Sequence, residues 1–138
     1  MITLIIGKKG SGKTKRLLEM CNDATAKSMG SVVFIEKDST LLTDLDHKTR
    51  LAVAEEYGVN SFDSLYGFIS GMCAGNYDIT DIFVDSTLKI GGANMPEFEA
   101  FIKRIARLSQ RTSAKMVFSI SADKSEIPEG VHDFVVEL

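Results

Sequence analysis

A glycine-rich octapeptide, G-K-K-G-S-G-K-T at residues 7–14, restricts this chain to few architectures. It matches the phosphate-loop pattern G-x-x-x-x-G-K-[S/T] at every fixed position. The apolar, β-branched run before it, residues 2–6, is typical of a buried parallel strand, and residues 13–28 after it have helical spacing. Gly7 and Gly12 permit backbone angles that let loop amides converge on an anion at a helix N-terminus. The octapeptide, called the glycine-rich loop below, therefore predicts a site for phosphate groups.

The positions of this loop have expected roles in holding a nucleotide. We expect the Lys13 ammonium to reach the β- and γ-phosphates, which makes it a catalytic candidate, and the Thr14 hydroxyl to bind Mg²⁺. Lys8 and Lys9 either face phosphate as well or belong to a solvated surface. The residues expected to contact the nucleotide are Gly7, Lys8, Lys9, Gly10, Ser11, Gly12, Lys13, Thr14 and Lys15.

Strand-like and helix-like segments alternate along the 138 residues. Strands are expected at residues 2–6, 31–35, 82–84, 116–120 and 134–136, with a brief edge strand at 59–62. Helices are expected at residues 13–28, 44–57 and 64–74, and from Pro96 onward. The alternation predicts one α/β domain spanning residues 1–138, with a mainly parallel five-stranded sheet in the order 5-1-4-3-2 and helices on both faces.

A second motif, which carries a carboxylate, completes the expected nucleotide site. Asp85 ends the apolar run 82–84, where a buried carboxylate is costly unless it is paired with an ion or water. We expect Asp85, together with Thr14, to hold Mg²⁺. Ser86 follows Asp85, so the acid that orients an attacking water must come from elsewhere or be absent.

Two other strand ends carry candidate side chains. Glu36 and Asp38 follow the strand at 31–35, at the sheet edge where open α/β folds bind ligands, and either one is a candidate to position the attacking water. Ser119 and Ser121 flank the end of the fourth predicted strand, and Ser119 is a candidate to sense the γ-phosphate.

Charge and composition exclude several classes of protein. Sixteen basic and 19 acidic residues give a net charge of −3, which disfavours a nucleic-acid-binding role. Cys21 and Cys73 match no metal spacing and no disulfide framework. The apolar run at 2–6 is too short for a signal peptide or a membrane span, so a cytoplasmic chain without membrane insertion is expected. A basic helix face is either solvated or reaches an acidic partner; its residues are Lys103, Arg104, Arg107 and Arg111.

These motifs resemble those of P-loop NTPases, in which the loop and the strand-end Asp are the Walker A and Walker B elements. The order of parts is similar to the RecA-like (ASCE) branch: Val84-Asp85-Ser86 resembles the segment with the magnesium Asp, and residues 33–38 resemble the one with the catalytic acid, aligned best on Asp38. Residues 54–59 resemble the helix end before the next strand of that family. The chain is also similar to short bacterial ATP-binding proteins labelled as twitching-motility ATPases.

The resemblance implies an ATP-binding, Mg²⁺-dependent hydrolase or nucleotide switch that acts with a protein partner or as a homo-oligomer. ATP is favoured because the guanine signature N-K-x-D is missing. Three alternatives remain open: a module that binds nucleotide without hydrolysis, a partitioning-type dimer switch in which Lys8 crosses to the second subunit, and a small-molecule kinase. The sequence identifies neither the partner nor the pathway.

Overall fold

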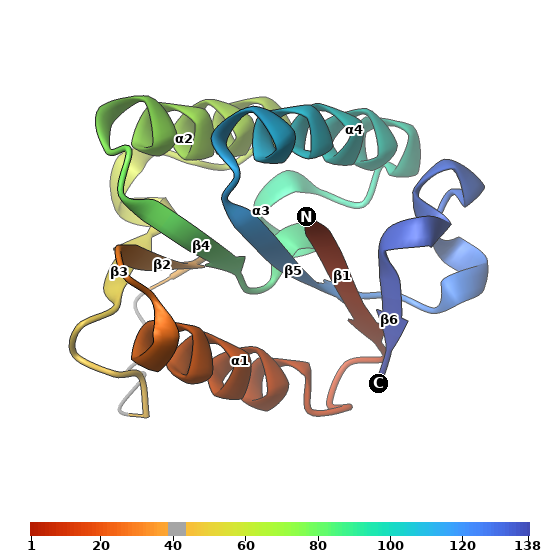
Figure 1. Cartoon of the computed structure of the whole chain (residues 1–138). Helices are drawn as coiled ribbons and strands as arrows, with labels where there is room; N and C mark the ends of the chain where they lie inside the picture. Colours follow the sequence, from red (N-terminus) through yellow and green to blue (C-terminus); the bar gives the residue numbers. More distant parts are fainter. Residues whose placement is uncertain (39–43) are drawn as a thin grey trace.

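The computed structural model describes residues 1–38 and 44–138 and has a parallel β-sheet at its centre (Figure 1). The six strands are β1 (Ile2–Gly7), β2 (Ser31–Glu36), β3 (Arg50–Val53), β4 (Ile79–Val84), β5 (Lys115–Ser121) and β6 (Val135–Glu137). Their order is β3-β2-β4-β5-β1-β6, and every neighbouring pair is parallel. The expected five-stranded sheet is therefore wrong in one respect, because β3 pairs outside β2, which was expected at the edge.

Helices cover both faces of the sheet, which confirms the α/β class. They are α1 (Lys13–Lys27), α2 (Phe62–Gly75), α3 (Thr87–Gly91) and α4 (Met95–Thr112), with 3-10 turns η1 (Ala54–Tyr57), η2 (Lys124–Glu126) and η3 (Glu129–Phe134). Figure 1 shows α2 and α4 side by side on one face and α1 on the other. Within the described ranges, no helix combines the length and the apolar character needed to cross a membrane.

The apolar side chains form two clusters, one on each face of the sheet. The larger one lies under α2 and α4 and contains Phe98, Phe101 and Phe118. The smaller one lies under α1 and contains Leu17 and Cys21, both fully buried. Because the central strands are buried on both faces, they are almost continuously apolar, as parallel strands usually are.

The strand register brings the carboxyl ends of β1, β4 and β5, where the candidate site residues lie, to the same edge of the sheet. Gly7, at the end of β1, is opposite Ser121 on β5, and Val84, at the end of β4, is opposite Phe118 on the same strand. The glycine-rich loop therefore leaves the sheet close to the residue that follows Val84, which is Asp85. Carboxyl ends of parallel strands at one edge are where open α/β folds bind ligands.

The helix expected at residues 44–57 is wrong. Residues 50–53 form β3, paired with β2, and residues 54–57 form the short turn η1, which ends at Gly58 with a φ of 69°. The run A-E-E-Y favours a helix locally, but the free edge of β2 offers the preceding residues a full ladder of backbone hydrogen bonds. Ala52 and Val53 are buried there, and this tertiary pairing overrides the local preference.

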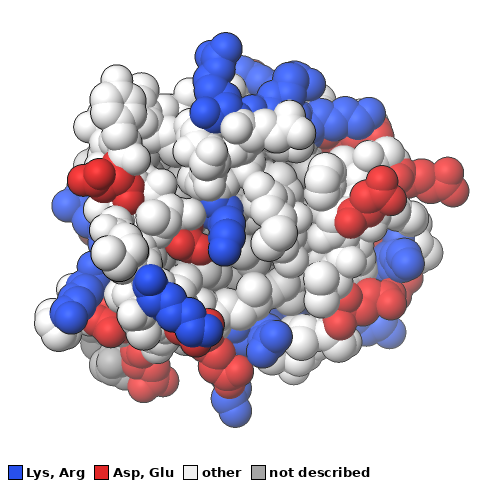
Figure 2. All heavy atoms as spheres, viewed as in Figure 1, with Lys and Arg blue, Asp and Glu red and all other residues white. Residues whose placement is uncertain are grey.

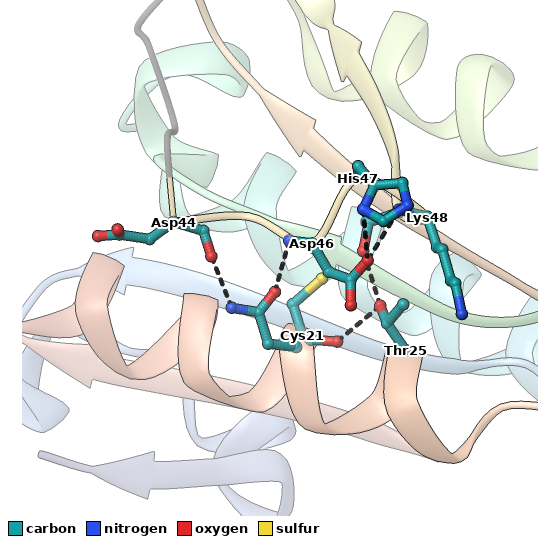
Figure 3. A network of polar contacts seen from close by, with 8 residues as sticks. Cys21, Thr25, Asp44, Asp46, His47 and Lys48 are labelled. Atoms are coloured by element: carbon teal, nitrogen blue, oxygen red, sulfur yellow. Dashed lines mark hydrogen bonds and ion pairs between the residues drawn. The ribbon is translucent and has the colours of Figure 1, made fainter.

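Residues 44–49, which lead into β3, are held on α1 by a polar network (Figure 3). The Asn22 side chain donates to the Asp44 carbonyl at 2.7 Å and accepts from the Asp46 amide at 2.9 Å. The Thr25 and Thr49 hydroxyls are hydrogen-bonded at 2.7 Å. The segment is thus fixed by side chains and by a helix, not by helical hydrogen bonds of its own.

The brief edge strand expected at residues 59–62 is also wrong. Ser61 is the N-cap of α2, and Phe62 is already the first helical residue. The Ser61 hydroxyl accepts from the Ser64 amide at 3.0 Å, and the Ser64 hydroxyl accepts from the Ser61 amide at 3.0 Å. This reciprocal pair is a capping box, which satisfies free amides at the helix start.

Candidate phosphate-binding site

The glycine-rich loop connects β1 to α1 through a tight turn. The Ser11 amide donates to the Lys8 carbonyl at 3.0 Å, and Gly10 and Gly12 have φ angles of 84° and 91°. Gly12 is also the N-cap of α1. The expectation for Gly7 needs a different reason, because its φ is not positive; a Cβ there would lie 2.5 Å from the Ser11 hydroxyl oxygen. A side chain at Gly7 would force Ser11 to move, whereas positions 10 and 12 favour glycine because of their positive φ angles.

Lys13 lies beneath this loop with 7% of its surface exposed. Its ammonium donates to the Lys8 carbonyl at 2.8 Å and to the Ser11 hydroxyl at 3.4 Å. Burial lowers the pKa of the Lys13 ammonium, and the nearby Asp85 carboxylate opposes that shift. An anion bound in the loop would favour the charged ammonium further, so lysine at this position suits phosphate.

Asp85 and Thr14 meet directly, although 71 positions separate them in the sequence. The Thr14 hydroxyl donates to one carboxylate oxygen of Asp85 at 3.0 Å, and the carboxylate is 6% exposed. A hydroxyl and a buried carboxylate at a phosphate loop are the protein ligands that Mg²⁺ uses beside phosphate oxygens and water. The two residues expected to hold Mg²⁺ therefore fit that ion.

Ser119 supports Asp85 from the neighbouring strand β5. Its hydroxyl donates to the other carboxylate oxygen of Asp85 at 2.6 Å and accepts from the Ser86 amide at 2.9 Å. Ser86 has a φ of 54°, an uncommon conformation for a residue other than glycine, asparagine or aspartate. These contacts indicate that Ser119 orients the Asp85 carboxylate and holds the turn at Ser86. The role of Ser119 as a γ-phosphate sensor stays a prediction.

A hollow of about 340 Å³ opens between the loop and these strand ends. Its lining residues are Lys9, Gly10, Gly12, Lys13, Thr14, Lys15, Asp85, Lys89, Ser119 and Ser121. Most of the expected nucleotide-binding residues meet here. Sequence reasoning missed Lys89, which lies four residues after Asp85 on the short helix α3, because its local sequence carries no signal of a site residue.

Lys8 does not line this hollow. It is exposed, and its charge contributes, after hydrogen bonds from Ser125, to lowering the pKa of the Asp123 carboxyl. The side chain is therefore near Asp123. Gly7 and Ser11 do not line the hollow either.

Glu36 and Asp38 are not among the lining residues either. Glu36 is the last residue of β2 and is 7% exposed, and Asp38 is exposed just beyond it. In the sheet, β4 and β5 separate β2 from β1, a distance of roughly 14 Å at about 4.8 Å per strand. A catalytic role for either acid stays a prediction.

The basic face of α4 is partly engaged within the protein. Figure 2 shows Lys and Arg side chains along α4 at the top of the view. Arg104 is bonded to Asp63 at 3.1 Å and stacks 3.9 Å from the centre of the Tyr66 ring. Arg104 therefore ties α4 to α2, which supports the structural interpretation for this residue.

A larger hollow of about 860 Å³ lies elsewhere, beside the C-terminal half of α1. It contains none of the residues expected in the nucleotide site, and its lining mixes both charges with apolar side chains such as Met29 and Tyr77. Size alone does not make it the functional site. No group of three or more metal-binding side chains occurs within residues 1–38 and 44–138.

Comparison with known proteins adds no family assignment. No protein-family model matches the chain, and a search of curated proteins gives no significant match. The function must therefore be argued from the site itself.

Proposed function

We propose that this chain binds ATP with Mg²⁺ in the hollow at the glycine-rich loop, and that it works as an ATPase or nucleotide switch with a partner or a second copy. The observation that carries the proposal is the 3.0 Å hydrogen bond between Thr14 and Asp85. It joins the end of the loop to a buried carboxylate from a different strand. Phosphate-binding amides, a lysine and a magnesium pair then face one space.

The residues divide the work by their chemistry. Amides of the loop and of the first turn of α1 bind phosphate oxygens, and Lys13 neutralises their charge. Bound Mg²⁺ would supply a Lewis acid that draws charge from the phosphates. Thr14 and Asp85 would hold the ion, and Ser119 fixes the carboxylate orientation through its 2.6 Å hydrogen bond.

A binding module without hydrolysis is the second candidate. Asp85 is the only carboxylate among the described residues that line the hollow, and Thr14 and Ser119 both donate to it. Ser86 occupies the position directly after it. These observations favour a site that holds nucleotide and depends on another molecule for the water-activating group.

Calorimetric titration with ATP and Mg²⁺ tests the proposal. The substitution Lys13→Met keeps the apolar stem and removes the charge, so we expect it to weaken binding roughly 10- to 100-fold. Lys48→Ala is the matched control, because Lys48 is exposed and its side chain points away from the polar network in Figure 3. Equal affinities for the parent and Lys13→Met would overturn the proposal.

A phosphate-release assay on the same proteins separates the two candidates. Turnover by the parent that Lys13→Met abolishes supports the ATPase. Tight binding without turnover, at any protein concentration, supports the binding module.

A further inference from the structure

The short helix α3 contributes one side chain, Lys89, to the hollow at the glycine-rich loop. It begins two residues after Asp85, and its Lys89 lines the hollow together with the loop lysines. A cation from α3 and the lysines of the loop thus line the same space where phosphates are proposed to bind.

The backbone of α3 is firmly anchored. Thr87 is fully buried and Ile90 is 2% exposed, so the helix has a core-facing side, and Lys89 is exposed on the other. The Lys89 amide donates to the Ser86 carbonyl at 3.0 Å. A Cβ at Gly91 would lie 2.2 Å from the Phe62 ring, which shows how closely α3 approaches α2.

The charge around Lys89 is unbalanced. Four lysines line the hollow against one carboxylate, Asp85, which Thr14 and Ser119 already contact. In the part of the chain that the structure describes, no carboxylate lies within ion-pair distance of the Lys89 ammonium. This excess of positive charge suits a ligand with several negative charges, such as a polyphosphate.

We propose that Lys89 is a specificity residue that binds the terminal phosphate and lets the site distinguish a triphosphate from a diphosphate. This rests on the proposed function for the position of the other phosphates. Asp85 and Thr14 would hold Mg²⁺, and a γ-phosphate that contacts this ion would then lie near the strand end from which α3 departs. Lys89 follows that strand end by one helical turn.

Affinities for ATP and ADP, measured with Mg²⁺ by calorimetry, test the assignment. For Lys89→Ala we expect ATP affinity to fall about tenfold and ADP affinity to stay within about twofold, because one charge-assisted contact is lost only with the triphosphate. Lys89→Arg should retain most of the preference for ATP. Lys48→Ala is again the control, and a thermal melt checks that Lys89→Ala folds.

Equal losses for ATP and ADP, or no loss for either, would overturn the assignment while leaving the proposed function intact. Titration with inorganic tripolyphosphate and pyrophosphate covers the case in which the parent binds no nucleotide. A preference for tripolyphosphate that disappears in Lys89→Ala then supports the assignment although the proposed function fails. If the parent shows no preference between the two anions, the Lys89 assignment is overturned as well.

Discussion

Ser119 shows how one hydroxyl can serve two neighbours at once. It donates to the Asp85 carboxylate and accepts from the Ser86 amide, so it links the magnesium candidate to the turn that starts α3. Both partners are difficult to satisfy otherwise, because the carboxylate is buried and Ser86 has an uncommon backbone conformation. Ser119 is itself only 2% exposed.

The substitution Ser119→Ala should affect magnesium more than phosphate. We expect the free energy of unfolding to fall by about 1–3 kcal/mol, because a buried carboxylate oxygen and a backbone amide both lose a partner. The ATP dissociation constant should rise several-fold with Mg²⁺ and stay unchanged in EDTA. Calorimetry under the two conditions, with chemical denaturation for stability, measures both effects.

Ser121→Ala provides the comparison for this experiment. Ser121 ends the same strand and lines the same hollow, but it is exposed and does not bond to Asp85. An equal loss of ATP affinity with and without Mg²⁺ in Ser119→Ala would contradict the positioning role and favour direct phosphate contact.

For single residues, the sequence predicts where a side chain lies in the fold better than it predicts which side chain it bonds to. Thr14 and Asp85 could be paired in advance, because each follows a buried strand and carries a ligand type that Mg²⁺ requires. The contact of Ser119 with Asp85 could not, since it depends on the register between β4 and β5. Lys89 was missed because nothing in its local pattern distinguishes it from a solvated lysine.

Among the secondary-structure elements, α1 does more than present its N-terminus to the hollow. Through Asn22 and Thr25 it also holds the segment that leads to the edge strand β3 (Figure 3). Residues 44–49 form no ladder of backbone hydrogen bonds, and the Asn22 side chain instead supplies hydrogen-bond partners for the Asp44 carbonyl and the Asp46 amide. Helix α1, which follows the glycine-rich loop, therefore also fixes the segment that leads into β3, the edge strand on the side of the sheet away from β1.

The substitution Asn22→Ala should loosen β3 and leave the phosphate site intact. We expect faster amide exchange across residues 44–53 and a loss of about 1–2 kcal/mol in stability, because two hydrogen bonds to the Asp44 carbonyl and the Asp46 amide are removed. ATP affinity should stay within about twofold. Hydrogen exchange read by mass spectrometry measures the first effect.

Asp23→Ala is the control for this change. It is the next residue on α1 and breaks only an exposed ion pair with Lys27 at 3.1 Å, which contributes little. Unchanged exchange at residues 44–53 in Asn22→Ala would show that β3 is held by its pairing with β2 alone.

The elements themselves were predictable where local pattern and tertiary environment agree. The apolar runs of β1, β2, β4 and β5 and the stripe of α4 are such cases. Residues 50–57 are the opposite case, since residues 50–53 pair with the free edge of β2 and leave residues 54–57 only a short 3-10 turn in place of the expected helix. Helix α3 has only five residues, too few for a helical period to appear in the sequence.

For the molecule as a whole, the two sides of the sheet are unequal. Two long helices cover one face, and α1 covers the other, where the smaller apolar cluster lies. Cys21 is at the centre of that smaller cluster and is fully buried. Burial raises the pKa of its thiol to about 11, and hydrogen bonds with Thr49 and Thr25 only partly oppose this.

The stability of the molecule should therefore decrease in alkaline solution partly through Cys21. Between pH 9.0, the ordinary value, and about 11, the unfolded thiol loses its proton while the folded one keeps it. The unfolded state then binds fewer protons, so the free energy of unfolding falls as the pH rises. Below pH 9.0 this contribution does not change with pH.

Urea denaturation at several pH values from 8 to 11, on the parent and Cys21→Ala, measures this effect. The substitution lowers stability at every pH by leaving a cavity, and we expect it also to make the decline with pH shallower. Burial also raises the pKa of the Cys73 thiol, so Cys73→Ala is the comparison, and we expect a smaller flattening there because that thiol is less buried. Parallel curves for the parent and Cys21→Ala would show that the thiol does not titrate differently in the two states.

The contact of Gly91 with the Phe62 ring has a consequence for the whole molecule. Phe62 is the first residue of α2, and its ring packs in a tilted arrangement against Phe98 and Phe101 of α4, at centroid distances of 5.9 and 5.2 Å. No side-chain atom separates Gly91 from the Phe62 ring, because a Cβ at Gly91 would lie only 2.2 Å from that ring. Helix α3, which carries Lys89 into the hollow at the glycine-rich loop, is thus in van der Waals contact with the aromatic side chains between α2 and α4. It cannot approach α2 without displacing the Phe62 ring.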